Sequence, residues 1–226
     1  MRIRRSLLVI VLAVASRTIG AQLTDTPIPG ARFGFTGGLN LSKFAGEGLG
    51  PTSNRHGFVG GVVLVTPFTP NFSTQLEALY SMKGMKSVSA LNSANYATFK
   101  LNYVEIPLML RGDAPIAMPV KPFAFTGPAF DFQVSCNSDV IANGKSDSAS
   151  CDEIESSASS GLKFNKFDVG WVFGGGLGFD VNNRRVSVAA RYEVGLRSIT
   201  STGSSKNRAL SFMASVEAPL PRRTRR

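Results

Sequence analysis

Apolar and polar side chains alternate with a period of two along most of this chain. That period places successive side chains on opposite faces of a β-strand, so each strand has one apolar face and one polar or small-residue face. The longest example covers residues 167–181, where large apolar residues occupy one face and glycine, valine and aspartate occupy the other. The pattern predicts an all-β protein.

Eight segments carry this alternation, and we expect each to form one long strand of an antiparallel sheet. Two of them change the face that carries their apolar residues part way along, next to Pro107 and Pro128. Proline cannot donate a hydrogen bond to a neighbouring strand, and one extra residue in a bulge reverses the facing of those that follow. We therefore interpret both as bulged strands. The expected strands cover about 33–42, 56–66, 72–83, 97–111, 122–135, 167–181, 186–196 and 210–218.

The connections between these strands alternate between long and short. Residues 67–71 and 182–185 form short turns, and 113–121 forms a longer turn with two prolines. An even number of strands that each span a bilayer, joined by alternating long loops and short turns, is the topology of an eight-stranded up-and-down transmembrane β-barrel. In that topology the turns and both termini are periplasmic. The four long loops, rich in Gly, Ser and Asn, are 43–55, 84–96, 136–163 and 197–206.

The polar faces of the strands contain many Gly, Ala and Ser residues and few Lys or Glu. Glycines such as Gly174 and Gly176 cover a sheet poorly against water but suit the inner wall of a narrow barrel, whose lumen holds side chains only. A soluble, lipocalin-like barrel is the alternative. Aromatic residues near the strand ends favour a bilayer, where they form two interfacial girdles. The periplasmic girdle is expected to contain Phe33, Phe35, Phe72, Phe123, Phe125 and Phe179, and the outer girdle Phe58, Tyr80, Phe99, Phe167 and Trp171.

The two ends of the chain differ in composition from its middle. A basic start, an apolar run at 7–15 and Ala21 before Gln22 are typical of a cleaved secretory signal peptide. The formal net charge of +10 lies mostly in the two end segments, which hold four arginines each, so no nucleic-acid binding is expected of the nearly neutral middle. We therefore divide the chain into a signal peptide at 1–21, a barrel at 22–220 and a basic C-terminal tail at 221–226.

Three pieces of the sequence resemble one known family. They are FGFTGGLNLSKF, QLEALYSMKGMK, and LNYVEIPLMLR followed by KPFAFTGPAFDF; the third contains a Tyr-x-Glu-x-Pro element at Tyr103, Glu105 and Pro107. These segments are similar to the PorT-like outer-membrane β-barrel family of Gram-negative bacteria. The resemblance covers essentially all of 22–220 and implies an eight-stranded outer-membrane barrel. It also implies, for some members, a link to secretion and gliding machinery.

Eleven charged residues fall on the predicted inner face, and both signs are present. Buried charges require partners, so we expect a network of paired charges that fills the lumen. A proton or ion path is the alternative. The residues expected to form this lumen ion network are Glu77, Lys83, Glu105, Arg111, Asp131, Arg191, Glu193 and Glu217, and Lys100, Asp168 and Asp180 are also predicted to face inward.

Cys136 and Cys151 are the only cysteines, and export to an oxidising compartment favours a disulfide between them. They lie in the Ser-rich third loop, whose acidic residues we expect to be solvated rather than to bind a cation. Reduction of the disulfide is expected to leave the barrel folded.

No catalytic, cofactor-binding or metal-binding residues are expected. The single histidine, His56, lies near Ser42 and Ser53 in sequence, but no nucleophile motif surrounds it. The glycines at 174–178 lie inside a strand and precede no helix, unlike those of a dinucleotide-binding loop. Clusters of Cys and His that would bind a metal are absent from the sequence.

The sequence therefore predicts a small outer-membrane β-barrel without enzymatic activity, with a side-chain-filled lumen and a structural or loop-mediated binding role. The expected partners are outer-membrane lipids, including lipopolysaccharide, and a protein that contacts the outer loops at 43–55, 84–96, 136–163 and 197–206. Three other functions stay open: an accessory of a secretion or gliding machinery, a narrow channel, and a hydrolase acting on lipid or protein.

Overall fold

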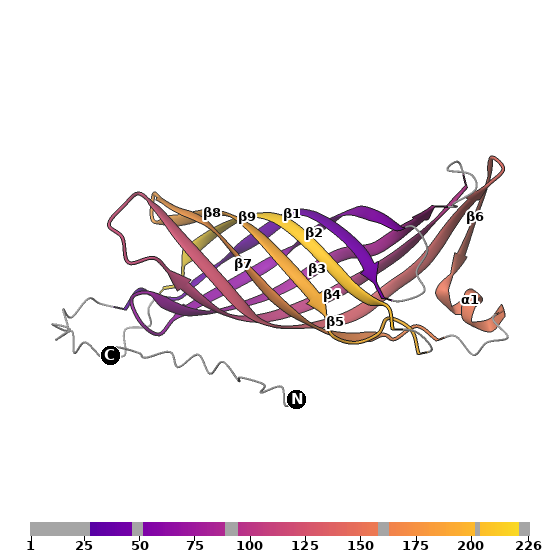
Figure 1. Cartoon of the computed structure of the whole chain (residues 1–226). Helices are drawn as coiled ribbons and strands as arrows, with labels where there is room; N and C mark the ends of the chain where they lie inside the picture. The colour runs from indigo at the N-terminus through magenta and orange to yellow at the C-terminus, as the bar shows by residue number, and fades with distance from the viewer. Residues whose placement is uncertain (1–27, 47–51, 89–94, 158–162, 202–203, 222–226) are drawn as a thin grey trace, which may run out of the picture.

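The protein is a closed antiparallel barrel in the computed structural model, which describes residues 28–46, 52–88, 95–157, 163–201 and 204–221 (Figure 1). Each wall strand pairs with the next wall strand along the chain, and β9 pairs with β1 to close the ring. The described wall strands are β1 (Arg32–Ala45), β2 (Thr52–Pro67), β3 (Phe72–Val88), β4 (Tyr96–Asp113), β5 (Val120–Ala142), β7 (Phe167–Val181), β8 (Arg184–Gly195) and β9 (Lys206–Pro219). The predicted eight-stranded barrel is confirmed.

The chain leaves the barrel near where it entered. The backbone N–H of Leu220 donates to the carbonyl oxygen of Ala31 at 2.8 Å, beside the paired ends of β9 and β1. The predicted signal peptide at 1–21 and residues 222–226 of the predicted basic tail lie outside the described residues. Within the described part of the chain, no helix is both long enough and apolar enough to cross a membrane.

The wall is apolar outside and largely polar inside. Phe35 and Phe58 have exposed fractions of 69% and 66% on the outer surface, whereas Lys83, Glu105 and Asp131 are fully buried. Closure of the sheet pairs the backbone groups of the wall strands with one another, which a wall in contact with hydrocarbon requires. The alternation predicted for β3, β7, β8 and β9 agrees with these facings.

Both bulges predicted beside prolines are wrong. In β4 every second residue from Leu101 to Arg111 is buried, including Pro107, so its facing never reverses. β5 keeps one register with β4 past Pro128 and shifts only near Asn102 and Tyr103, where β5 has one extra residue. The apolar residues at the start of β4 face the lumen. Along β4 the inward-facing residues therefore change from apolar to charged, while the same alternate positions keep facing the lumen.

The predicted periplasmic girdle is wrong at Phe123 and Phe125, which are buried inside the barrel. Their rings stack with centroids 6.1 Å apart, and the guanidinium carbon of Arg111 lies 3.8 Å from the centroid of Phe123. A guanidinium over an aromatic face gains cation–π attraction, which explains aromatic residues at these inner positions. Phe99, predicted for the outer girdle, packs against an apolar cluster in the lumen instead.

Short connections gather at one end of the barrel, which we call the turn end (left in Figure 1). They join β2 to β3, β4 to β5, and β7 to β8. Asn182 and Asn183 connect β7 to β8 with positive φ values of 47° and 62°, as a two-residue type I′ hairpin requires. We call the opposite end the loop end.

The chain between β5 and β7 forms a hairpin and a helix at the loop end, where the sequence predicted only a loop at 136–163 (Figure 1). β5 continues to Ala142 and pairs with β6 (Lys145–Ser150). The turn between them consists of Asn143 and Gly144, whose φ values are 53° and 77°. We call residues 136–157 the outer extension.

The helix of the outer extension, α1 (Cys151–Ser157), is fixed at its first turn. The N–H of Glu153 donates to Ser150 Oγ, and the N–H of Ser150 donates to Glu153 Oε2 at 2.7 Å. This capping box satisfies helix-end donors and lowers the pKa of Glu153 through the Ser150 N–H. A disulfide joins Cys151 to Cys136 in β5, with their Cα atoms 5.4 Å apart.

Candidate functional site

The centre of the barrel holds a cluster of buried charges around Lys83 of β3. Its ammonium nitrogen lies 2.7 Å from Glu105 Oε1 of β4 and 2.8 Å from Asp131 Oδ2 of β5. A third carboxylate, Glu193 of β8, lies 2.5 Å away. An ammonium group has three N–H donors, so one donor is available for each carboxylate. We call Lys83, Glu105, Asp131 and Glu193 the central cluster.

Arg191 of β8 extends this network toward the turn end. Its two terminal nitrogens lie 2.7 Å from Glu105 Oε2 and 3.0 Å from Glu77 Oε2. Gln75 donates to Glu77 at 2.6 Å and accepts a hydrogen bond from Arg111 at 3.1 Å. Side-chain contacts are therefore continuous from the central cluster to Arg111.

A second group of charges, the turn-end group, consists of Arg32, Arg111, Asp113, Arg185 and Glu217. Asp113 lies 3.3 Å from Arg111 Nε and 2.5 Å from a terminal nitrogen of Arg185. Glu217 lies 2.9 Å from Arg32 Nε and 3.6 Å from Arg111. The inner faces of β1, β4, β8 and β9 meet here, so that every charge of the group has an opposite charge beside it.

The structure places all eight residues of the predicted lumen network inside the barrel, each in an ion pair with another charged residue. Two other predicted inward charges, Lys100 and Asp180, lie at the rims, where they pair with Asp139 and Lys121. Asp168 is buried and accepts a hydrogen bond from Asn207 at 3.3 Å.

Sequence analysis missed Arg32, Asp113 and Arg185 because it assigned them to turns or to positions before a strand. The alternation of facing identifies two of them. Asp113 lies two residues beyond Arg111 on the same face of β4, and Arg185 lies two residues before the buried Ser187 of β8.

The formal charges of the two groups differ in sign. Two cations, Lys83 and Arg191, face four buried carboxylates in and beside the central cluster, which leaves an excess of two negative charges. The turn-end group has three arginines and two carboxylates, an excess of one positive charge. The electrostatic potential inside the barrel is therefore more positive at the turn end than around the central cluster.

Three carboxylates of the central cluster could hold a metal ion by their spacing. Oxygens of Glu105, Asp131 and Glu193 lie within 4.8 Å of one another. The ammonium group of Lys83, however, contacts all three. The protein's own side chain therefore takes the position of a cation, and the arrangement fits a structural network better than a metal centre.

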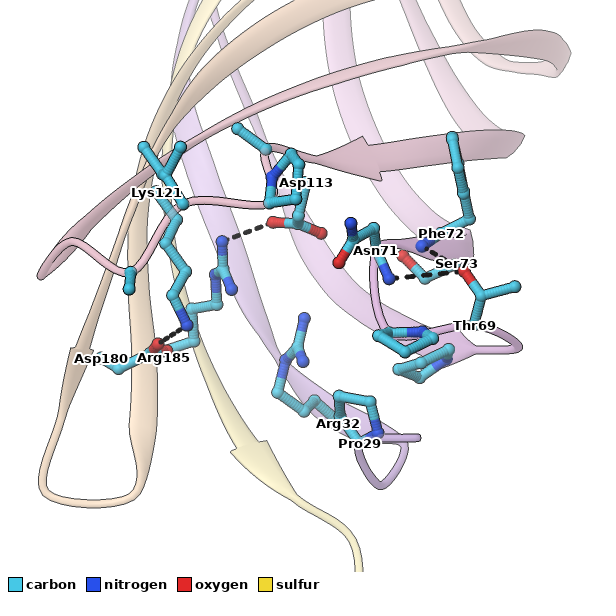
Figure 2. A pocket seen from close by; sticks show the side chains of 16 residues that line it. Pro29, Arg32, Thr69, Asn71, Phe72, Ser73, Asp113, Lys121, Asp180 and Arg185 are labelled. Atoms are coloured by element: carbon cyan, nitrogen blue, oxygen red, sulfur yellow. Dashed lines mark hydrogen bonds and ion pairs between the residues drawn. The ribbon is translucent and has the colours of Figure 1, made fainter. Parts of the chain in front are cut away.

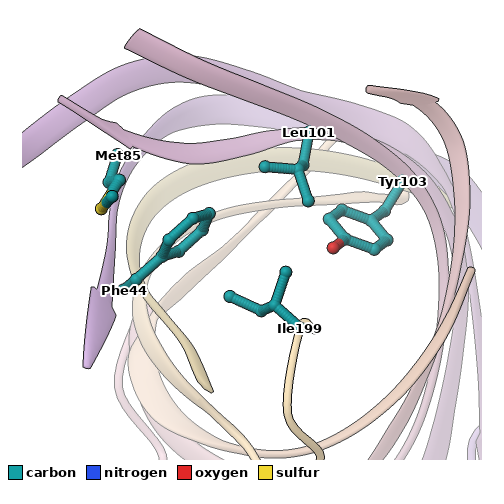
Figure 3. Packing of buried hydrophobic residues seen from close by; sticks show 5 residues of the cluster. All are labelled: Phe44, Met85, Leu101, Tyr103 and Ile199. Carbon is teal, nitrogen blue, oxygen red and sulfur yellow. The ribbon is translucent and has the colours of Figure 1, made fainter. Parts of the chain in front are cut away.

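An apolar cluster, which we call the plug, fills the lumen at the loop end (Figure 3). It consists of Phe44, Met85, Leu101, Tyr103 and Ile199, whose side chains converge inside the ring of strands. Leu101 and Tyr103 have exposed fractions of 0% and 1%. The ring of Tyr103 also lies 5.5 Å from Lys83 Nζ, so the plug borders the central cluster directly.

The turn end is open. A cavity of about 950 Å³, which we call the turn-end cavity, is lined by side chains that include Arg32, Ser73, Asp113 and Arg185 (Figure 2). Farther inside, the space beside Arg111 measures about 20 Å³, room for about one water molecule. The turn-end cavity is therefore blind, because the network and the plug fill the lumen beyond it.

The arrangement around His56 does not form a catalytic triad. His56 is exposed, whereas Ser42 is buried and donates to the carbonyl oxygen of Gly84 at 3.0 Å. The exposed Ser53 hydroxyl lies beside the carbonyl oxygen of Lys86. The buried serine and the histidine thus lie on opposite faces of the wall.

The chain is similar to known proteins over most of its length. The family model of the outer membrane protein β-barrel domain matches residues 21–201. Similar crystal structures include Neisserial surface protein A, with 14% identity, a TM-score of 0.49, and coverage of 84% of this chain and 99% of that one. Ail of Yersinia pestis has 15% identity, a TM-score of 0.42 and coverage of 84% and 99%. OprG of Pseudomonas aeruginosa has 11% identity, a TM-score of 0.46 and coverage of 85% and 98%. No curated protein matches the sequence.

Proposed function

Because the chain belongs to the outer membrane protein β-barrel domain family and lies in the outer membrane, we propose that it is a sealed, non-enzymatic barrel that binds through its outer loops. Short turns of such barrels face the periplasm. The turn end is then periplasmic, and the loop end with the outer extension faces outward. The barrel holds the loops at the membrane surface.

The filled lumen is the observation that carries this proposal. The plug and the central cluster follow each other along the axis, and Leu101, Tyr103 and Lys83 are each at most 1% exposed. A channel would need a continuous wet path, and eight strands leave room for side chains only. A structural role or binding at the loops is therefore favoured over transport.

Purified protein in planar bilayers tests the seal. We expect no stable conductance, because both the plug and the central cluster would have to move to open a path. A large and stable conductance would instead establish the channel alternative. A folded state must be shown beforehand by the shift in gel mobility between heated and unheated samples.

The outer extension is the part of the loop end best suited to contact a protein. Its hairpin is joined to α1 by the disulfide, and Val140 has an exposed fraction of 41%. We expect a photo-crosslinking residue at Val140 to capture a protein on intact cells. The same residue at Ile116, at the turn end, is the matched control. Equal labelling at both positions, or labelling that survives loss of both cysteines, would argue against a structured binding surface.

Lipids of the outer membrane, including lipopolysaccharide, are the partners proposed for the wall. The exposed apolar residues of β1 and β2, such as Phe35 and Phe58, offer the apolar surface that acyl chains contact. Binding of lipopolysaccharide is tested by native mass spectrometry of protein extracted in mild detergent.

A finer proposal is membership of the PorT-like group, with an accessory role in secretion or gliding. It is supported by the segments quoted above. Tyr103 and Glu105 of the Tyr-x-Glu-x-Pro element belong to the plug and the central cluster, and Pro107 also faces inward. Deletion of the gene is expected to reduce secretion or gliding. Unchanged secretion and gliding would leave only the loop-binding role.

A further inference from the structure

The turn-end cavity has the size and the shape of a ligand site. Its volume of about 950 Å³ lies within the range of about 300–1,000 Å³ that is usual for small-molecule pockets. Its apolar lining consists largely of prolines, and its charged lining residues include Arg32, Asp113 and Arg185, with Lys121 and Asp180 at the rim. Because the lumen beyond is filled, anything that enters from the periplasm must leave the same way.

The polar groups of this cavity favour an anion. The turn-end group has three arginines against two carboxylates, and the nearby Lys121 is balanced by Asp180 at 3.2 Å. Figure 2 shows Arg32 and Arg185 in the same opening, and they come from β1 and β8, the two strands that flank β9. Arg32 uses its Nε atom on Glu217. A positive excess inside a partly enclosed cavity attracts negative ligands more strongly than it would on an open surface.

Two buried polar atoms of the cavity have no hydrogen-bond partner among the described residues. They are Nε of Arg185, a residue 6% exposed, and Oγ of Ser73, a residue 2% exposed. Both residues line the cavity and come from different strands, β8 and β3. A buried polar group without a partner costs free energy, so a ligand that supplies acceptors to both gains affinity.

The Arg185 side chain lies against the wall of the cavity, between Asp113 and Gly178. Asp113 takes one of its terminal nitrogens, which leaves the Nε donor unused. Gly178 of β7 lies beneath the guanidinium, and a Cβ at that position would come within 2.5 Å of Nε. The absence of a side chain at Gly178 therefore creates the space in which this guanidinium lies.

We propose that the turn-end cavity binds a phosphate group from the periplasmic side. The guanidinium of Arg185 and the hydroxyl of Ser73 turn toward the ligand and donate to its oxygens, and the excess positive charge of the turn-end group neutralises it. Phosphate suits donors that converge from different walls, because its oxygens accept from several directions and arginine is well matched to them. The group has two possible sources: a free organic phosphate, or a phospholipid headgroup of the inner leaflet.

The test uses full-length protein and glycerol 3-phosphate, whose chemistry both sources share. In a nonionic detergent we expect saturable binding with a dissociation constant of about 1 mM or tighter, measured by calorimetry or by phosphorus NMR. Ser73→Ala, which removes one hydroxyl, should weaken binding about fivefold, and Arg185→Gln about tenfold or more. Arg208→Gln removes one positive charge near the loop end and is the matched control, with unchanged binding.

Protein in phosphatidylglycerol nanodiscs distinguishes the two sources. Loss of glycerol 3-phosphate binding there assigns the cavity to a lipid headgroup, and retained binding assigns it to a soluble phosphate. Absence of saturable binding in detergent overturns the proposal. Equal weakening by Ser73→Ala, Arg185→Gln and Arg208→Gln, or by none of them, also overturns it, because binding would then follow net charge alone. Ser73→Ala keeps the test valid if Arg185→Gln fails to fold.

Discussion

The two ends of this barrel lumen differ in the chemistry of the side chains that fill or line them. The loop end is closed by the plug, whose members Leu101 and Tyr103 are apolar or aromatic. The turn end opens into a cavity lined by paired charges. One strand passes through both environments: the inner face of β4 runs from Leu101 through Glu105 to Arg111. An inner face of constant direction can thus carry three kinds of chemistry.

The difference has a consequence for stability. The plug is held by apolar packing, so its residues tolerate loss of a few atoms at a graded cost. The central cluster is held by contacts between buried opposite charges, where removal of one partner leaves others buried and unpaired. Substitutions should therefore be most severe in the centre, intermediate in the plug and weakest at the exposed rim.

The largest effect is expected for Lys83→Met. The substitution keeps much of the side-chain volume but leaves Glu105, Asp131 and Glu193 without their shared cation, at a cost of about 3–5 kcal/mol. The urea midpoint of the barrel in lipid vesicles measures it. Lys86→Met in the same strand is the control, because the Lys86 ammonium lies outside the central cluster, 3.6 Å from the centroid of the Tyr96 ring. Equal midpoints for the two variants would show that the central cluster does not hold the barrel together.

An intermediate effect is expected for Leu101→Ala. Leu101 is fully buried in the plug, and truncation of a buried leucine costs about 2–5 kcal/mol. Leu108→Ala is the control in the same strand, since Leu108 faces outward and is 45% exposed. The two urea midpoints should differ clearly, while neither variant should conduct ions, because the central cluster remains. Conductance in Leu101→Ala alone would make the plug the only seal.

Sequence alternation was sufficient for the wall strands and the closed barrel, because a period of two fixes facing wherever the two faces differ in polarity. It failed where the inner face is apolar. Leu101 and Tyr103 alternate out of phase with the later apolar residues Ile106, Leu108 and Leu110, and that change of face predicted a bulge beside Pro107. The lumen of a membrane barrel holds apolar residues too, and polarity alone does not separate the two sides there.

Two further features of the structure could not be predicted from the polarity pattern alone. Phe123 faces inward because Arg111 lies against its ring, a contact between strands that sequence spacing does not reveal. The hairpin of the outer extension, by contrast, had a local signal. Asn143 followed by Gly144 is a strong two-residue turn motif, but the polar Ser-rich residues around it do not alternate as half-buried strands do. A strand that is exposed on both faces, such as β6, does not show the alternation of apolar and polar residues.

A small effect is expected for Lys121→Ala at the rim of the turn end. The ion pair of Lys121 with Asp180 spans 3.2 Å, but the two side chains are 37% and 52% exposed. Water and salt screen such a pair, so its loss should change stability by less than about 1 kcal/mol. Urea midpoints at low and high salt measure the change, with Lys83→Met as the reference. A loss as large as that of Lys83→Met would show that exposure does not separate the rim from the centre.

The smallest effect on the barrel is expected from reduction of the Cys136–Cys151 disulfide. The bond joins α1 to β5 in the outer extension, beyond the plug. Its loop of about 15 residues contributes roughly 3 kcal/mol in the simplest chain-entropy model, but only to the order of the extension itself. Trypsin cleavage at the exposed Lys145 should therefore become faster after reduction, while the urea midpoint of the barrel stays the same. The Cys136→Ser, Cys151→Ser double variant should behave like the reduced protein. A lower urea midpoint in either form would mean that the outer extension helps to hold the loop end of the wall closed.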